Sequence, residues 1–131
     1  MHIFRELLRI FFLPILLFIF NLIVDVGFHI YNLFPFFDIP MHFLGGLFIG
    51  ISGWRGLQVL EKKKYIKVKQ FVLSWIIIVC FVGTIAVLWE FYEYIWDVIF
   101  PTQFQAGLKD TMGDLFFGLL GGIFSVLFRK K

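Results

Sequence analysis

Long apolar segments alternate with short polar segments along the whole chain. Four apolar segments, at about 7–28, 39–60, 70–100 and 110–128, approach or exceed the roughly 20 residues that a membrane-spanning helix needs. The polar positions gather between these segments and at their ends. The pattern predicts an all-α, polytopic membrane protein, with one transmembrane domain over residues 1–131 folded as a four-helix bundle.

Prolines and acidic residues mark where the predicted spans begin, bend and end. Pro14 predicts a kink in the first span, and Pro101 predicts the end of the third. Asp38 followed by Pro40 is typical of a helix start, because an acid can cap the first turn and proline is tolerated there. Residues 32–37 are expected to form a short connection between the first two spans.

Composition excludes a water-soluble fold and most nucleic-acid-binding classes. Hydrophobic residues make up 60% of the chain and charged residues 16%, whereas soluble chains average roughly 45–50% and 25%. The mean hydropathy is +0.91. The net charge of +3 comes from lysines and arginines beside apolar segments, a pattern typical of membrane topology rather than of nucleic-acid binding. Cys80 is the single cysteine, so no disulfide can form within the chain.

The basic residues predict the orientation. Ten of the twelve fall at the N-terminus, in the loop after the second span and at the C-terminus: Arg5, Arg9, Lys62, Lys63, Lys64, Lys67, Lys69, Arg129, Lys130 and Lys131. Arg55 lies near the same end of the second span, and Lys109 alone falls on the other side. In a four-span chain these three regions share one side of the membrane. By the positive-inside rule both termini are cytoplasmic, here in a bacterial cytoplasmic membrane.

Seven of the nine acidic residues are expected at the opposite, extracytoplasmic side: Asp25, Asp38, Glu90, Glu93, Asp97, Asp110 and Asp114. His29 and His42 share that depth. Charged groups inside a membrane are costly unless something partners them. Because the acids come from all four spans and meet at one depth, they predict an outward-facing acidic site.

Small residues follow one face of three spans and lead toward these acids. Gly46 and Gly50 continue the face of His42, and Gly118 and Gly122 continue the face of Asp114. On the third span, Gly83 and Ala86 continue the face of Glu90. Small residues let membrane helices approach closely. The sequence therefore predicts close helix packing beneath the acidic site.

The leading hypothesis is a divalent-cation site that binds or acts on a phosphate-bearing envelope lipid. Oxygen ligands suit Mg²⁺, Mn²⁺ or Ca²⁺, and such an ion can clamp a phosphate and activate water. The expected metal ligands are Glu90, Glu93, Asp110 and Asp114. The expected catalytic acid or base is Asp38 or His42.

Two other functions stay open. Intramembrane carboxylates and histidines also mark cation or proton pathways, which would make the protein a transport component. The glycine-rich faces and the small size would equally suit a non-catalytic assembly partner or a homo-oligomer. The common nucleophile, zinc and phosphate-loop signatures are missing from the sequence, so whether the chain is an enzyme stays open too. Membrane lipids are expected partners and nucleic acids are not.

Three motifs carry a resemblance to a known family: Asp38-x-x-x-His42-Phe43, Trp89-Glu90-x-x-Glu93, and Asp110-x-x-x-Asp114 followed by Gly118 and Gly121-Gly122. They resemble the small bacterial VanZ-like and YjdF-like membrane proteins, over roughly residues 37–124. VanZ-like proteins are linked to glycopeptide resistance and the cell envelope. The resemblance implies an envelope setting and an outward-facing site, without implying a particular reaction.

Overall fold

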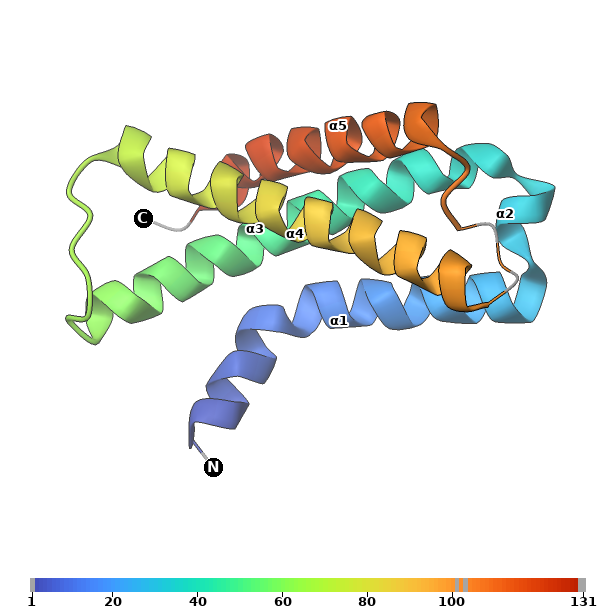
Figure 1. Ribbon diagram of the computed structural model, residues 1–131. Coiled ribbons are helices and arrows are strands. Elements are labelled where there is room, and N and C mark those ends of the chain that lie inside the picture. Colours follow the sequence, from blue (N-terminus) through green and yellow to red (C-terminus); the bar gives the residue numbers. More distant parts are fainter. Residues whose placement is uncertain (1, 101, 103, 130–131) are drawn as a thin grey trace.

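The computed structural model describes residues 2–100, 102 and 104–129. Pro101, Lys130 and Lys131, which entered the predicted span end and topology, lie outside the described residues. The described chain is helical throughout its regular elements (Figure 1): α1 (His2–Phe28), α2 (Ile30–Leu33), the 3₁₀ turn η1 (Pro35–Phe37), α3 (Asp38–Lys62), α4 (Phe71–Ile99), α5 (Leu108–Phe124) and the 3₁₀ turn η2 (Ser125–Phe128). Four helical segments, α1, α3, α4 and α5 with η2, are long and apolar enough to cross a membrane. The predicted fold class is confirmed.

Helices α1 and α3 run beyond the predicted spans because polar residues at the membrane interface continue a helix as well as apolar ones do. Helix α4 is one residue shorter than predicted at each end, and α5 begins two residues earlier and gives way to the 3₁₀ turn η2 at Ser125. The connection expected at 32–37 contains helical structure, α2 and η1, instead of being a plain loop. His29 separates α1 from α2 with a left-handed backbone, at φ 49°. Asp38 is the first residue of α3 rather than its cap, since Phe37 holds the cap position without a side-chain hydrogen bond.

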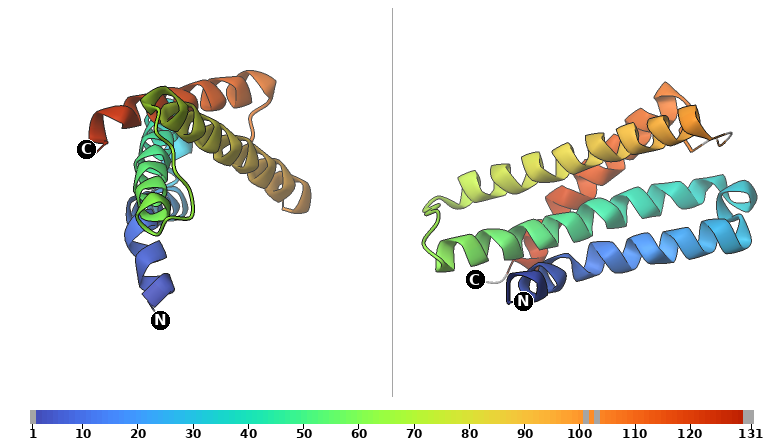
Figure 2. Two further views of the ribbon diagram at one scale, coloured as in Figure 1. Left: turned by 90° about the vertical axis from the view of Figure 1, so that its left-hand side faces the viewer. Right: turned by 60° about the horizontal axis from the view of Figure 1, so that its bottom comes forward.

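Helix α3 lies at the centre of the molecule and contacts each of the other three long helices. Its most extensive contact is with α5, and α1 packs chiefly against α3. Figure 2 (right) shows α1, α3 and α4 side by side, with α5 crossing behind α3. Residues on α3 can therefore meet residues from any other span.

The contact between α3 and α5 is a backbone-to-backbone approach that requires glycine. A Cβ atom built on Gly46 would lie 1.8 Å from the carbonyl oxygen of Gly118. One built on Gly121 would lie 2.0 Å from the carbonyl oxygen of Phe43. The small residues that the sequence placed on these two faces thus pack against each other within one chain.

The first helix is bent in its N-terminal half, which Figure 1 shows plainly, and Pro14 lies inside this helix. Proline has no N–H to donate to the carbonyl four residues earlier, which here belongs to Ile10. The hydroxyl of Ser52 on α3 donates to that carbonyl oxygen at 2.8 Å. A neighbouring helix therefore satisfies the backbone group that the proline leaves unpaired, as membrane helices require.

The two ends of the molecule differ in their chemistry. The start of α1, the connection between α3 and α4 and the end of η2 share one end (Figure 1). There Lys63 pairs with Glu6, and the Arg129 guanidinium lies 5.4 Å from the centre of the Trp54 ring. The opposite end holds the start of α3 and the connection between α4 and α5. The centre is apolar, with Trp54, Leu57, Ile78 and Val82 forming its buried cluster.

Candidate functional site

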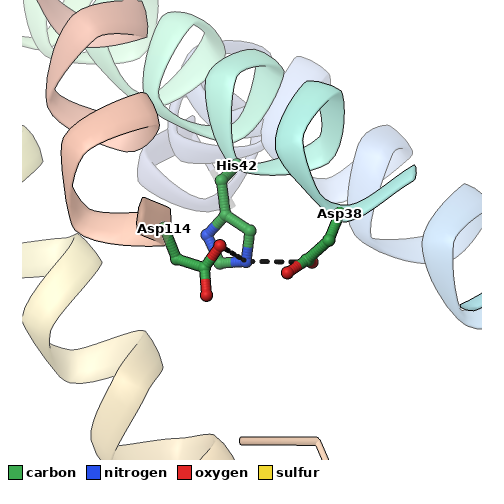
Figure 3. Close-up of side chains that lie close together, drawn as sticks. All are labelled: Asp38, His42 and Asp114. Carbon is green, nitrogen blue, oxygen red and sulfur yellow. Dashed lines mark ion pairs between the residues drawn. The ribbon is translucent and has the colours of Figure 1, made fainter. Parts of the chain in front are cut away.

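His42 is the residue around which the polar side chains of three helices gather. It lies one turn into α3, so its side chain shares a face with that of Asp38. The Nε2 atom of His42 lies 3.2 Å from Oδ1 of Asp38 and 3.7 Å from Oδ1 of Asp114 on α5 (Figure 3). Asp114 is buried, whereas His42 and Asp38 are partly exposed. Two carboxylates from different helices thus face one imidazole.

A second group of side chains reaches His42 from α4. Glu90 and Glu93 are three residues apart and so share one face of that helix. One ligand atom each from His42, Glu90 and Glu93 lies within 4.8 Å of the others. The same limit holds for Asp38, His42 and Asp114. We call these five residues the His42 cluster: Asp38, His42, Glu90, Glu93 and Asp114.

Within the His42 cluster, Glu90 and Glu93 differ in their partners. The indole N–H of Trp89 donates to Oε1 of Glu93 at 2.7 Å. Glu90 is only 6% exposed, yet its buried Oε2 accepts no hydrogen bond from the described residues. Leaving a buried charged acceptor unpaired costs several kcal/mol, on the order of the penalty for a lost charge-assisted bond. Glu90 therefore has a buried carboxyl oxygen that the hydrogen bonds of the described chain leave unused.

A cavity of about 260 Å³ lies on the α5-facing side of Glu90. Its lining is largely apolar and comes from α4, from the connection to α5 and from α5 itself: Val87, Glu90, Phe91, Tyr94, Gln105, Thr111 and Leu115. Glu90 belongs both to this lining and to the His42 cluster. An apolar space thus opens directly beside the unpaired carboxylate.

Three of the acids predicted at this end belong to neither of the two groups of neighbouring ligand atoms around His42. Asp110, a predicted metal ligand, is not brought to His42; its Oδ2 accepts the backbone N–H of Ala106 at 3.2 Å, which stabilises the start of α5. Asp97 accepts the hydroxyl of Thr102 at 2.6 Å and backbone N–H groups of the following loop. Asp25 is partly exposed, as a solvated carboxylate would be. The structure thus separates helix-end and loop carboxylates from those that face His42.

Tyr31 and Trp89 border the site. Trp89 belongs to one of the three sequence motifs, whereas the sequence did not single out Tyr31. The Tyr31 hydroxyl donates to Oδ1 of Asn21 across the break between α1 and α2. Burial, and then the negative charge of Asp38, raise the pKa of Tyr31 well above 10. The spacing of four residues between Trp89 and Glu93 fits the hydrogen bond between them. Tyr31 could not have been found from the sequence, because the left-handed turn at His29 that places it leaves no pattern there.

Comparison with known proteins places the chain in a family. Residues 5–130 match the family described as "Predicted membrane protein (DUF2238)". The chain belongs to this family. A Thermotoga maritima protein with the printed name "Uncharacterized protein" is 38% identical over 101 residues, which are 73% of this chain and 50% of that protein. The chain thus spans about half the length of this curated relative. No solved structure matches it.

Family membership and the four apolar helices establish a multi-pass membrane protein. The family description supports the membrane part of the resemblance drawn from the sequence motifs. It does not name VanZ-like or YjdF-like proteins, so that closer relationship stays a prediction.

Proposed function

We propose that the His42 cluster binds a divalent cation and, through it, the phosphate group of an envelope lipid. The observation that carries the proposal is the buried, unpaired Oε2 atom of Glu90 beside His42 and Glu93. A cation at this point would supply the positive partner that the carboxylate needs.

The spacing of the ligand atoms supports such an ion. Ligands on opposite sides of a small divalent cation are about 4.2 Å apart, twice the usual bond length of roughly 2.1 Å. The atoms of His42, Glu90 and Glu93 lie within 4.8 Å of one another, so small side-chain movements would close the site. Two carboxylates with one imidazole favour Mn²⁺ over Mg²⁺ or Ca²⁺, which prefer oxygen ligands alone.

Asp38 and Asp114 have a supporting role in this proposal. A carboxylate that accepts the N–H of a metal-bound histidine fixes the ring and makes it a better ligand. Asp38 is hydrogen-bonded to Nε2 of His42, which leaves the other ring nitrogen to the ion. His42, predicted from the sequence as an acid or base, thus becomes a ligand, and Asp38 becomes a residue that positions it.

A phosphate-bearing lipid suits the surroundings of the site. Three protein ligands leave coordination positions open, and a divalent ion binds phosphate oxygens through such positions. The apolar cavity beside Glu90 would hold the first part of the lipid chain. All but one of the lysines and arginines belong to segments toward the other end of the spans, and Lys109 alone lies at the end of the site, so by the positive-inside rule the site faces the extracytoplasmic side of a bacterial cytoplasmic membrane.

The transport and assembly hypotheses have less support. The buried centre below the site consists of apolar side chains together with Ser52, Ser74 and Ser125, and none of these titrates. Gly46, Gly50, Gly121 and Gly122 pack within the chain, so they do not offer a surface to a second protein.

Calorimetric titration of the detergent-purified protein with Mn²⁺ tests the cation site. We expect saturable binding that Glu90→Gln weakens at least tenfold, because the amide keeps the shape and loses the charge. Asp110→Asn is the matched control, since it removes one carboxylate at the same end but outside the His42 cluster. Absence of saturable binding, or equal losses in both variants, would refute the cation site.

Binding of a lipid phosphate by the ion is tested separately, with two amphiphiles that differ in the phosphate group. Dioctanoyl phosphatidic acid should bind the Mn²⁺-loaded protein more tightly than dioctanoylglycerol, which has the same chains and no phosphate. Chelation of Mn²⁺ with EDTA should remove the difference. If the difference persists without Mn²⁺, the phosphate is bound elsewhere and the lipid proposal is wrong, even if the cation site stands.

A further inference from the structure

A second cavity, of about 290 Å³, lies between α1, α3 and η2. Its lining is mostly apolar: Leu13, Leu47, Phe48, Ile51, Trp54, Arg55, Gln58 and Phe128. We call it the α1–α3 groove. No residue of this groove belongs to the His42 cluster, so it requires its own explanation.

The groove runs lengthwise along one half of the membrane. On α3 it extends from Leu47 to Gln58, which at 1.5 Å per residue is roughly 16 Å. The hydrocarbon core of a bilayer is about 30 Å thick, so this length matches one leaflet. Leu47 lies nine residues from Asp38, near the bilayer centre, and Gln58 lies near the interface that carries the basic residues.

The charge of the groove is concentrated at its interfacial end. Among the described residues that line it, Arg55 has the charged side chain, and its Nη1 lies 3.5 Å from the carbonyl oxygen of Arg9. Arg129 is close by, over the ring of Trp54, which itself lines the groove. An apolar slot that ends at arginines complements an acyl chain that ends at a phosphate.

We propose that the α1–α3 groove binds one acyl chain of an anionic phospholipid from the leaflet of the basic residues, with the lipid phosphate at Arg55. The length of the groove matches one acyl chain that runs from the interface to the bilayer centre. Arg55 indicates that the lipid headgroup is anionic, because a basic residue at the interface attracts anionic lipid. A free phosphate ion would leave the apolar part of the groove unfilled, so the occupant is the lipid itself. This site is independent of the proposed cation site.

Native mass spectrometry of the detergent-purified full chain tests the proposal, with phosphatidylglycerol and phosphatidylcholine of identical acyl chains as probes. We expect one phosphatidylglycerol molecule to be retained in preference to phosphatidylcholine. Arg55→Gln should reduce that preference about fivefold, the effect of one interfacial basic residue. Lys64→Gln is the matched control, because it removes the same charge from the same end of the molecule outside the groove.

A second variant tests the groove without changing charge. Leu13→Trp places a large ring from α1 into the slot and should reduce retention of phosphatidylglycerol, with an unchanged thermal unfolding temperature as the check that the chain is folded. Equal retention of the two lipids by the unaltered protein would overturn the proposal. So would equal effects of Arg55→Gln and Lys64→Gln, or a lipid-free dimer that occupies the groove with a second copy.

Discussion

Two adjacent glycines on α3 should respond in opposite ways to the same substitution. A Cβ atom on Gly46 would lie 1.8 Å from the carbonyl oxygen of Gly118, whereas one on Gly45 would meet nothing within 4 Å. Gly46→Ala and Gly45→Ala add the same methyl group to the same helix, one residue apart. Their difference therefore measures the contact between α3 and α5 alone.

The expected changes in the free energy of unfolding follow from the geometry of the contact. Real Cβ contacts essentially never fall below 3.0 Å, so α3 and α5 must separate by at least 3.0 − 1.8 = 1.2 Å in Gly46→Ala. Overpacking costs about 1–3 kcal/mol, and this contact belongs at the upper end, about 2–3 kcal/mol, because it is with backbone atoms that cannot change rotamer. Replacing a helical glycine by alanine returns about 1 kcal/mol. We expect a net loss of about 1–2 kcal/mol for Gly46→Ala and a gain of up to about 1 kcal/mol for Gly45→Ala.

Thermal unfolding in one detergent checks that Gly46→Ala is less stable, and Gly45→Ala more stable, than the unaltered protein. The same separation should reach the site, because Gly46 lies one turn after His42 and Gly118 one turn after Asp114. Mn²⁺ affinity should therefore fall in Gly46→Ala and stay unchanged in Gly45→Ala. If Gly46→Ala unfolds at the same temperature as the unaltered protein or above it, the close approach of α3 and α5 is wrong.

Two further predictions concern α1 and its end. Ser52→Ala should destabilise the protein by about 1–3 kcal/mol, because it leaves the buried Ile10 carbonyl oxygen unpaired. Adding Pro14→Ala, which restores the helical N–H donor, should reduce that loss. Thr84→Ala is the control in the same thermal unfolding assay, because the Thr84 hydroxyl donates to a carbonyl of its own helix. The raised pKa of Tyr31 contributes stability that is fully present below pH 10, the ordinary value, and is lost as pH rises above it. Tyrosinate absorbance at 295 nm should show a late-titrating group that Tyr31→Phe removes, and an unchanged titration in that variant would contradict the burial of Tyr31.

Much of the fold could be predicted because a membrane restricts what the sequence can do. Apolar length sets the spans, and every backbone group must be paired inside the bilayer, so helices are the expected structure. Periodicity also placed His42, Glu90 and Asp114 on inward faces. It could not distinguish Asp110 from Asp114, since both lie on one face of α5. That distinction depends on the backbone N–H of Ala106, and loop geometry leaves little trace in a sequence.

The packing around the site is close on one side and open on the other. Toward α5, glycine contacts bring the backbone of α3 against that of α5, one turn from the pair formed by His42 and Asp114. Helix α4 also packs tightly on α5 near the middle, where a Cβ on Gly122 would lie 2.8 Å from Val82. Two turns further along α4, the cavity beside Glu90 separates the same two helices. Glu90 is thus the member of the His42 cluster that a ligand entering between α4 and α5 would meet first. Its Oε2 atom accepts no hydrogen bond from the described residues, whereas Oδ1 of Asp38 and Oδ1 of Asp114 lie 3.2 and 3.7 Å from Nε2 of His42.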